Sequence, residues 1–347
     1  MKDDLKLWEY ANKIIPGGNG LLSKRPHRFC PYYWPTYFSK AKEIYIWDLK
    51  NKKYTDMSLM GIGTSILGYS NNEVDSSVKR KISQGINTTL NSVEEVKLAE
   101  EILKVDTFAD KVKFARSGGE AMSIAIRIAR AKSNKTKIAF SGYHGWHDWY
   151  ISANLKNKKN LNNHLLKNVK PLGVPKELKN TTIPIKFNDI KSLISTINKN
   201  KLAAIVVEPG RFDLMKKEFV NCLNKISKQK KICLISDEIT CGWRSNLGGL
   251  YKKIGLKPDI VVYGKALGNG YAISSIVGKN YYLKEANKTF ISSTAWTERI
   301  GFVSALKVIE ILKKKNYSHI SKISKIIKND WLHYSSMHKI KIKVNNY

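Results

Sequence analysis

The sequence has few of the features that mark secreted, membrane or metal-binding proteins. Its 347 residues include four cysteines, Cys30, Cys222, Cys233 and Cys241, with no paired spacing. This pattern argues against a disulfide framework or a cysteine-based zinc site and predicts a reducing cytoplasm. No apolar run reaches the ~18 residues that a membrane helix needs, and the opening MKDDLKLWEYANKIIPGG lacks a signal-peptide core. We therefore expect a cytoplasmic protein with no membrane partner.

Acidic residues are scarce as well: 28 Asp and Glu stand against 61 Lys and Arg, which gives a net charge of +33. Such an excess would suit a polyanion such as nucleic acid. The lysines, however, are spread along the chain and are not interleaved with aromatic residues in an RNA-binding motif. A composition rich in Lys, Asn and Ile is one that biased codon usage would produce. Nucleic acid is therefore not the expected partner.

Hydrophobic residues make up 42% of the chain, which is enough for a large core. In residues 1–58 the segment EIYIWDLKNKKYTDM alternates and turns near residues 50–52, so it predicts a β-hairpin. From about residue 60, short apolar runs alternate with amphipathic helical patterns such as 120–132 and 218–230. The apolar runs predict buried strands at 112–115, 138–140, 203–207, 232–235, 260–263 and 274–277.

This alternation is typical of an α/β fold in which a mostly parallel sheet has helices on both faces. We predict a large domain over residues 59–290. The N-terminal segment 1–58 and residues 291–347 would form a small α+β domain whose C-terminal part looks truncated. In such sheets ligands bind beyond the carboxyl ends of the strands, so we look there for functional residues.

The first strand is followed by RSGGEAMSIAIRIARA, in which Ser117 and Glu120 have capping-box spacing. Gly118 and Gly119 would let a ligand approach the backbone, and the free N–H groups of a helix start suit a phosphate. A well-capped helix without a ligand would give the same pattern.

The second strand leads into SGYHGWHDWY. His144 and His147 lack the further ligands of a zinc site, so no metal is expected. The aromatic cluster could be core packing, or Tyr143 could lie flat against a planar ligand. The segment alone leaves both readings open.

Charged side chains follow three later strands: Glu208, the pair Asp237 and Glu238, and Lys265. A carboxylate at the end of a buried strand is costly without a partner. Lys265 is the one charged residue in IVVYGKALGNGYAISSIVG, where a lone lysine would usually extend to water. Because these strand ends converge on one crevice, the groups together predict a functional site.

Taken in order, SGGEA, YHGWHDW, VEP, DEITCGWR and PDIVVYGKALGNGY resemble the class III aminotransferases of the fold-type I pyridoxal-phosphate superfamily. IIPGGNG and DEITCGWR are most similar to the glutamate-1-semialdehyde 2,1-aminomutase branch. The resemblance covers nearly the whole chain. It implies pyridoxal 5'-phosphate as the cofactor, a small-molecule amino donor with a carbonyl acceptor, and a homodimer with shared active sites.

The resemblance also implies roles for single residues. Lys265 would hold the cofactor as a Schiff base, and its apolar neighbours would lower its pKa. Asp237 would pair with the protonated ring nitrogen, which makes the ring an electron sink. Tyr143 would stack on the ring with His144 beside it, and Glu208 would support the ring. The phosphate would be bound by Ser117, Gly118 and Gly119, and by Thr294 of the other subunit. Arg25 lies near a family arginine that binds a substrate carboxylate.

The implied reaction is amino transfer, in which Lys265 moves a proton as general base and then as general acid. Two departures from the family favour a transaminase over the aminomutase. Gly119 replaces a threonine of many relatives, and TAWTERIG replaces a glycine-rich segment of the mutases. The aminomutase stays as the alternative. An inactive truncated relative with only a binding role is a further alternative, against which the presence of both Lys265 and Asp237 argues.

The last segment, HKIKIKVNNY, alternates lysine with apolar residues and predicts a strand after helices at 298–313 and 319–333. Nothing follows to cover its apolar face. We therefore expect an incomplete chain that binds the cofactor weakly, aggregates and turns over little. Pairing of this strand with the hairpin at 45–54 is the alternative.

Overall fold

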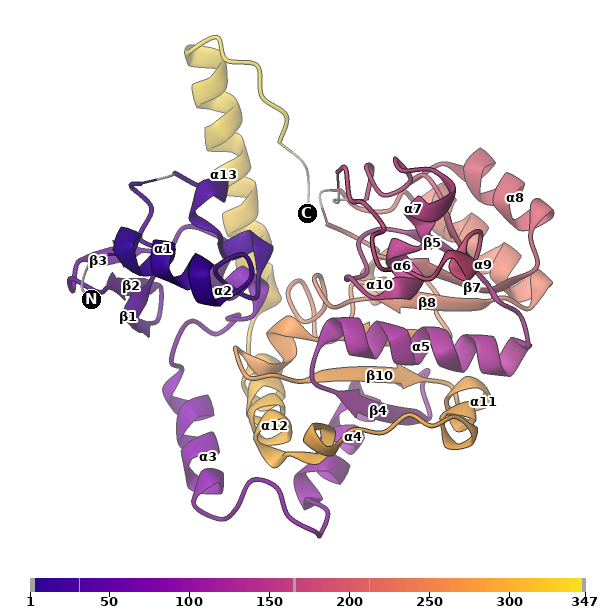
Figure 1. Cartoon of the computed structure of the whole chain (residues 1–347), viewed down its shortest axis with the longest axis horizontal. Coiled ribbons are helices and arrows are strands. Elements are labelled where there is room, and N and C mark those ends of the chain that lie inside the picture. Colours follow the sequence, from indigo (N-terminus) through magenta and orange to yellow (C-terminus); the bar gives the residue numbers. More distant parts are fainter. Residues whose placement is uncertain (1–3, 31, 165–166, 212, 345–347) are drawn as a thin grey trace.

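The computed structural model describes residues 4–30, 32–164, 167–211 and 213–344. Its centre is a seven-stranded sheet with the strand order β4-β10-β9-β8-β7-β5-β6 (Figure 1). Neighbouring strands from β9 to β6 are parallel, whereas β10 is antiparallel to both β9 and β4. The strands are β4 (Lys111–Ala115), β5 (Lys137–Ser141), β6 (Thr182–Pro184), β7 (Leu202–Val207), β8 (Cys233–Asp237), β9 (Ile260–Tyr263) and β10 (Ser274–Gly278).

The prediction of a mostly parallel sheet is confirmed, and all six predicted strands are present. Two details differ from the prediction. The strand β8 continues to Asp237, so this carboxylate belongs to the last residue of the strand. The strand β6 was not predicted, because this three-residue edge strand ends in proline and is too short to show alternation.

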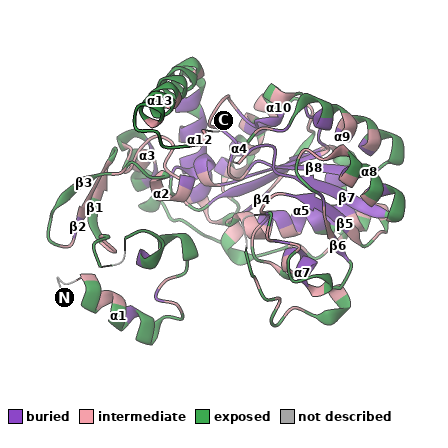
Figure 2. Cartoon of the chain, turned by 90° about the horizontal axis from the view of Figure 1, so that it is seen from above, coloured by how far each residue is buried: buried purple, intermediate pink, exposed green. Residues whose placement is uncertain are grey.

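Helices cover both faces of the sheet, as predicted. On one face α5 (Gly118–Ser133) packs against β7, β8, β9 and β10. The core of the other face includes residues of α4 (Val93–Val105), α8 (Ile190–Lys199), α9 (Lys217–Lys230) and α12 (Arg299–Lys313). Figure 2 shows the sheet as the main buried region of the molecule.

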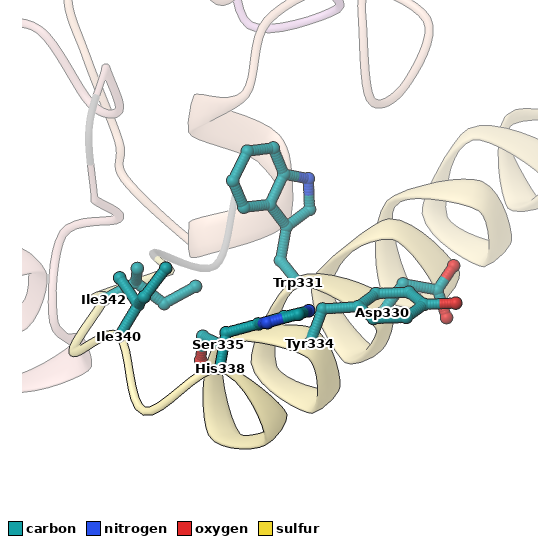
Figure 3. A pocket seen from close by; sticks show the side chains of 7 residues that line it. All are labelled: Asp330, Trp331, Tyr334, Ser335, His338, Ile340 and Ile342. Carbon is teal, nitrogen blue, oxygen red and sulfur yellow. The ribbon is translucent and has the colours of Figure 1, made fainter.

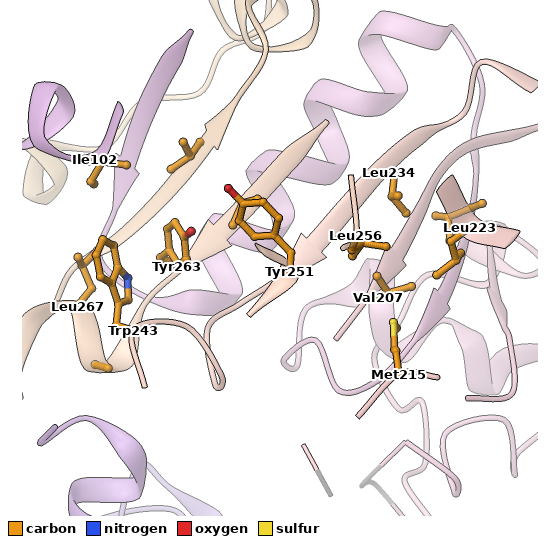
Figure 4. Packing of buried hydrophobic residues seen from close by; sticks show 14 of the residues in the cluster. Ile102, Val207, Met215, Leu223, Leu234, Trp243, Tyr251, Leu256, Tyr263 and Leu267 are labelled. Atoms are coloured by element: carbon orange, nitrogen blue, oxygen red, sulfur yellow. The ribbon is translucent and has the colours of Figure 1, made fainter. Parts of the chain in front are cut away.

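The two cores follow the alternation of side chains along each strand. In β9, Val261 and Tyr263 belong to the core of the α9 and α12 face, whereas Ile260 and Val262 belong to the core beneath α5. Figure 4 shows Tyr263 near Trp243 and Leu267 in the first of these cores. A strand buried on both faces explains the uninterrupted apolar runs in the sequence.

The N-terminal segment contains the predicted hairpin. β2 (Tyr45–Asp48) and β3 (Lys53–Thr55) pair antiparallel, and β1 (Phe38–Lys42), which was not predicted, completes a three-stranded sheet. The further helices of the described chain are α1 (Asp4–Ile14), α2 (Met60–Gly63), α3 (Asn72–Ile82), α6 (Asp148–Ile151), α7 (Ala153–Lys156), α10 (Tyr251–Ile254), α11 (Asn280–Leu283) and α13 (Tyr317–Met337), with 3-10 turns η1 (Leu22–Lys24), η2 (Pro26–Arg28), η3 (Lys176–Leu178), η4 (Lys265–Gly268), η5 (Lys284–Lys288) and η6 (Thr294–Thr297).

The C-terminal region agrees with the prediction only in its helices. α12 and α13 are present, and α13 carries no buried residue among those described and projects from the body of the molecule (Figure 1). The prediction of a strand after α13 is wrong over residues 340–344, and residues 345–347 lie outside the described chain. The N-terminal sheet contains β1, β2 and β3, so the segment does not pair there. Without a partner strand, its backbone groups gain nothing from an extended ladder.

The proposed boundaries at residues 58 and 290 stay a prediction. None of the helices in the described ranges is both long enough and apolar enough to cross a bilayer.

Candidate active site

The predicted site residues come from the ends of neighbouring strands. Ser117 follows β4, Tyr143 follows β5, and Glu208 follows β7. Asp237 ends β8, and Lys265 begins the turn η4 after β9. Because these strands run in one direction, their carboxyl ends meet at one edge of the sheet. The hydrogen bonds at this edge join side chains that follow β7, β8 and β9 into one network.

Lys265 lies at one end of this network. Its Nζ donates to Thr240 Oγ1 at 3.0 Å. Burial lowers the pKa of the Lys265 amine, and the neighbouring Arg211 guanidinium lowers it further. The backbone of Lys265 has φ of 45°, an uncommon conformation for a residue with a side chain. The position therefore favours a neutral, nucleophilic amine near the strand end.

Asp237 forms a buried pair with His144. His144 Nδ1 lies 2.7 Å from Asp237 Oδ2, and both side chains are almost fully buried. Asp237 Oδ1 also accepts the backbone N–H of Ile239 at 3.1 Å. Ile239 follows Asp237 by two residues, so the local turn itself helps to orient the carboxylate. A carboxylate fixed in this way could hold a proton on a nearby ring nitrogen.

Glu208 forms a second pair with Arg211, three residues along the chain. Arg211 Nε and Nη2 donate to the two Glu208 oxygens at 2.8 and 2.6 Å. Arg211 Nη2 also donates to Thr240 Oγ1 at 3.0 Å, and Glu208 Oε2 accepts the N–H of Tyr143 at 3.2 Å. The Arg211 guanidinium lies 5.2 Å from the centre of the Tyr143 ring. This network links Tyr143 to Lys265 through Glu208, Arg211 and Thr240.

Arg211 and Thr240 were not identified in the sequence analysis. Each lies three residues after a carboxylate that was identified, Glu208 or Asp237. The same rule about strand ends would have found them if it had been extended by three residues.

The start of α5 has the predicted capping box. The Ser117 hydroxyl accepts the Glu120 N–H, and the Glu120 carboxylate accepts the Ser117 N–H. Gly118 packs closely against Ile239, because a Cβ there would lie 2.8 Å from Ile239 Cδ1 and would require this side chain to shift. The N–H groups of the first turn have no partner within a helix, so they can receive an anion. This glycine cradle, the orienting carboxylate and the depressed lysine pKa fit a phosphate-bearing aldehyde such as pyridoxal phosphate.

Two predicted residues lie apart from the network. Thr294 is exposed at the start of η6. Arg25 lies in the N-terminal segment against Gly17, where an added Cβ would be only 1.9 Å from Arg25 Nη2. The roles of both residues stay predictions.

A separate apolar cavity lies at the end of α13 (Figure 3). It lies between the last turns of the helix and the segment that follows, and contains none of the predicted site residues. The cavity is lined by Asp330, Trp331, Tyr334, Ser335, His338, Ile340 and Ile342.

In the described ranges, no cluster of three or more His, Cys, Asp or Glu could hold a metal ion.

The network predicts opposite effects of its two charges on Lys265. Arg211→Gln should raise the pKa of Lys265, because a neighbouring positive charge is removed. Glu208→Gln should lower it, because the negative charge that favours the ammonium form is lost. The pH dependence of trinitrobenzenesulfonate labelling, located at Lys265 by peptide mapping, would measure both shifts. Shifts in the same direction, or none, would contradict this account of the network.

Residues 32–342 match the family model of the class-III aminotransferases. The chain is 35% identical over 332 residues to the glutamate-1-semialdehyde 2,1-aminomutase of Nitrosopumilus maritimus (strain SCM1). This alignment covers 92% of this chain and 76% of that protein. It is 33% identical over 320 residues to the 3-aminobutyryl-CoA aminotransferase of Cloacimonas acidaminovorans (strain Evry), in an alignment that covers 89% of this chain and 73% of that protein.

Solved structures show the same fold. The FumI protein of Sphingopyxis sp. MTA144, in a form with pyridoxal phosphate, matches with a TM-score of 0.86 and 23% identity over 97% of this chain and 79% of that chain. A transaminase with bound pyridoxal phosphate matches with a TM-score of 0.88 and 21% identity over 99% of this chain and 81% of that chain. Together with the family match, these likenesses confirm the predicted α/β fold with its mostly parallel sheet. The chain belongs to the class-III aminotransferase family, whose enzymes use pyridoxal phosphate.

Proposed function

We propose that this chain is a transaminase in which Lys265 is the attachment point of pyridoxal phosphate. The observation that carries the proposal is the environment of the Lys265 amine. It is held by Thr240 beside the Glu208–Arg211 pair, and burial lowers its pKa. A lysine that is easily deprotonated can both attack a carbonyl and carry a proton.

When bound, pyridoxal phosphate supplies an electron sink for negative charge at the substrate α-carbon. The chain's own residues would do the rest. Asp237, oriented by His144, holds a proton on the ring nitrogen. Tyr143 packs against the ring, and the N–H groups of Gly118 and Gly119 receive the phosphate. The Lys265 Nζ would take the α-proton of the substrate as general base and would then act as general acid.

The aminomutase is the second candidate, because several relatives of similar identity are glutamate-1-semialdehyde 2,1-aminomutases. The two functions differ in what they consume. A transaminase needs an amino donor and a separate carbonyl acceptor, whereas a mutase converts one molecule that carries both groups. A screen of donors and acceptors on the purified protein, with glutamate-1-semialdehyde alone as one condition, would separate them.

A cytoplasmic location is also part of the proposal, and it is supported by four cysteines that are all free thiols. Cell fractionation would test it.

The first prediction concerns Lys265. Borohydride reduction of the holoprotein should fix the cofactor to Lys265, as peptide mapping would reveal. Lys265→Ala should hold the cofactor only non-covalently and lose turnover. Lys279→Ala is a matched control, because this lysine pairs with Asp259 away from the site and should not affect labelling. Labelling at another lysine would refute the assignment.

A second prediction concerns Asp237. Asp237→Asn should keep the fold but slow removal of the substrate α-proton by about 10²- to 10³-fold, because an amide does not stabilise a protonated ring nitrogen by charge. The measurement is single-turnover exchange of the α-proton for deuterium, followed by NMR. Asp330→Asn on the exposed helix α13 serves as the control. A rate close to that of the unaltered protein would show that Asp237 is not the ring partner.

We further propose a homodimer in which the exposed Thr294 contributes to the partner's site. Chains with Lys265→Ala and chains with Thr294→Ala should each be weak alone. Mixed dimers would contain one site in which both groups are intact, so co-expression should restore up to about a quarter of normal turnover. If Thr294 served its own subunit, no mixed site would be intact and turnover would not recover.

A further inference from the structure

Gly119, the second residue of α5, lies directly beneath the imidazole of His147. A Cβ on Gly119 would be 2.5 Å from His147 Cε1 and 2.7 Å from its Nδ1. The ring therefore fills the space that a side chain at position 119 would occupy. The backbone of the same loop is close as well, because a Cβ on Gly145 would lie 3.5 Å from the Gly119 Cα. These two segments, far apart in sequence, fit each other at the start of α5.

The imidazole of His147 is held in place but lacks a partner. The Trp146 ring stacks on it with centroids 4.4 Å apart and an interplanar angle of 29°. The His147 Nδ1 atom is buried and has no hydrogen-bond partner within the described chain. Leaving a buried polar atom unpaired costs about 1–3 kcal/mol. A group that binds at the helix start would remove this cost.

The start of α5 offers few side-chain donors to an anion. The Ser117 hydroxyl donates to the Glu120 carboxylate at 3.0 Å, and the Ser117 N–H donates to the same oxygen at 2.7 Å. Gly119 has no side chain. The open donors in the first turn are thus the N–H groups of Gly118 and Gly119. These two N–H groups alone would leave acceptor positions of a phosphate with three oxygens unfilled.

We propose that His147 binds the cofactor phosphate, in the place that a side chain at position 119 would otherwise take. The inference rests on the proposed function. In the absence of a ligand, burial lowers the pKa of His147. With hydrogen on Nδ1, as in one neutral tautomer or in the protonated ring, this N–H is a donor at the helix start, in addition to the two glycine N–H groups.

The test measures cofactor binding rather than turnover. His147→Ala should weaken pyridoxal phosphate binding by about 10- to 100-fold, because a hydrogen bond to a charged group is lost. It should also shift the ³¹P resonance of the bound phosphate. His147→Gln, which keeps an N–H donor, should bind more tightly than His147→Ala. His333→Ala, the same change on the exposed helix α13, should bind like the unaltered protein.

A double variant tests whether the two positions substitute for each other. Gly119→Thr alone should weaken binding, because its side chain meets the His147 ring. His147→Ala combined with Gly119→Thr should bind more tightly than either single variant, because the hydroxyl enters the vacated space and reaches the phosphate. Circular dichroism would confirm that each variant folds. A ring that merely packed against the helix would leave both the cofactor affinity and the ³¹P resonance of His147→Ala like those of the unaltered protein.

The outcomes separate this inference from the proposed function. If the unaltered protein holds pyridoxal phosphate on Lys265 and His147→Ala binds it equally well, the inference about His147 is wrong and the proposed function stands. The same holds if the double variant shows no recovery over His147→Ala. If the unaltered protein does not attach the cofactor at Lys265, the proposed function itself fails, and the inference fails with it.

Discussion

The site depends on the pairing of ionisable groups at the carboxyl ends of three adjacent buried strands. Glu208 and Asp237 are almost fully buried, and each would be costly alone. Arg211 gives Glu208 a bidentate partner, and His144 together with a backbone N–H satisfies Asp237. Lys265 donates to the Thr240 hydroxyl, and burial and Arg211 lower its pKa. Charge is therefore concentrated at this edge without leaving either acid unpaired.

Much of the fold could be predicted from the sequence, because its strands are buried on both faces. The run Ile260–Tyr263 is apolar throughout and could be recognised without knowledge of its neighbours. The failures lie where partners decide the structure. Residues 340–344 alternate like a strand, yet none of the strands in the described part of the chain pairs with them. The edge strand β6 is short, and its pairing with β5 rather than its own pattern defines it.

The candidate site likewise contains some residues that can be recognised in the sequence and others that only the structure identifies. Lys265 and Asp237 stand out in the sequence because their charge interrupts or ends an apolar run. Arg211 could not be distinguished among 61 basic residues until the structure placed its guanidinium on Glu208 and near Tyr143. The fit between Gly119 and His147 is likewise invisible in one sequence, because it depends on how a loop after β5 meets a helix after β4. Sequence thus identifies charges in unusual places, whereas three-dimensional contacts assign their partners.

Asp237 and Glu238 show how one dipeptide contributes to both the candidate site and the fold. The Asp237 carboxylate faces His144, whereas Glu238 is fully buried and accepts the N–H groups of Leu250 and Tyr251 at 2.9 and 2.8 Å. Ser236 and Cys241 add further hydrogen bonds, while burial raises the pKa of Glu238 to about 7. Through these hydrogen bonds, Glu238 holds Leu250 and Tyr251 close to the end of β8 and so fixes both ends of the segment 238–251. Thr240 lies within this tied segment, so an acid that does not contact Lys265 helps to fix the hydroxyl that does.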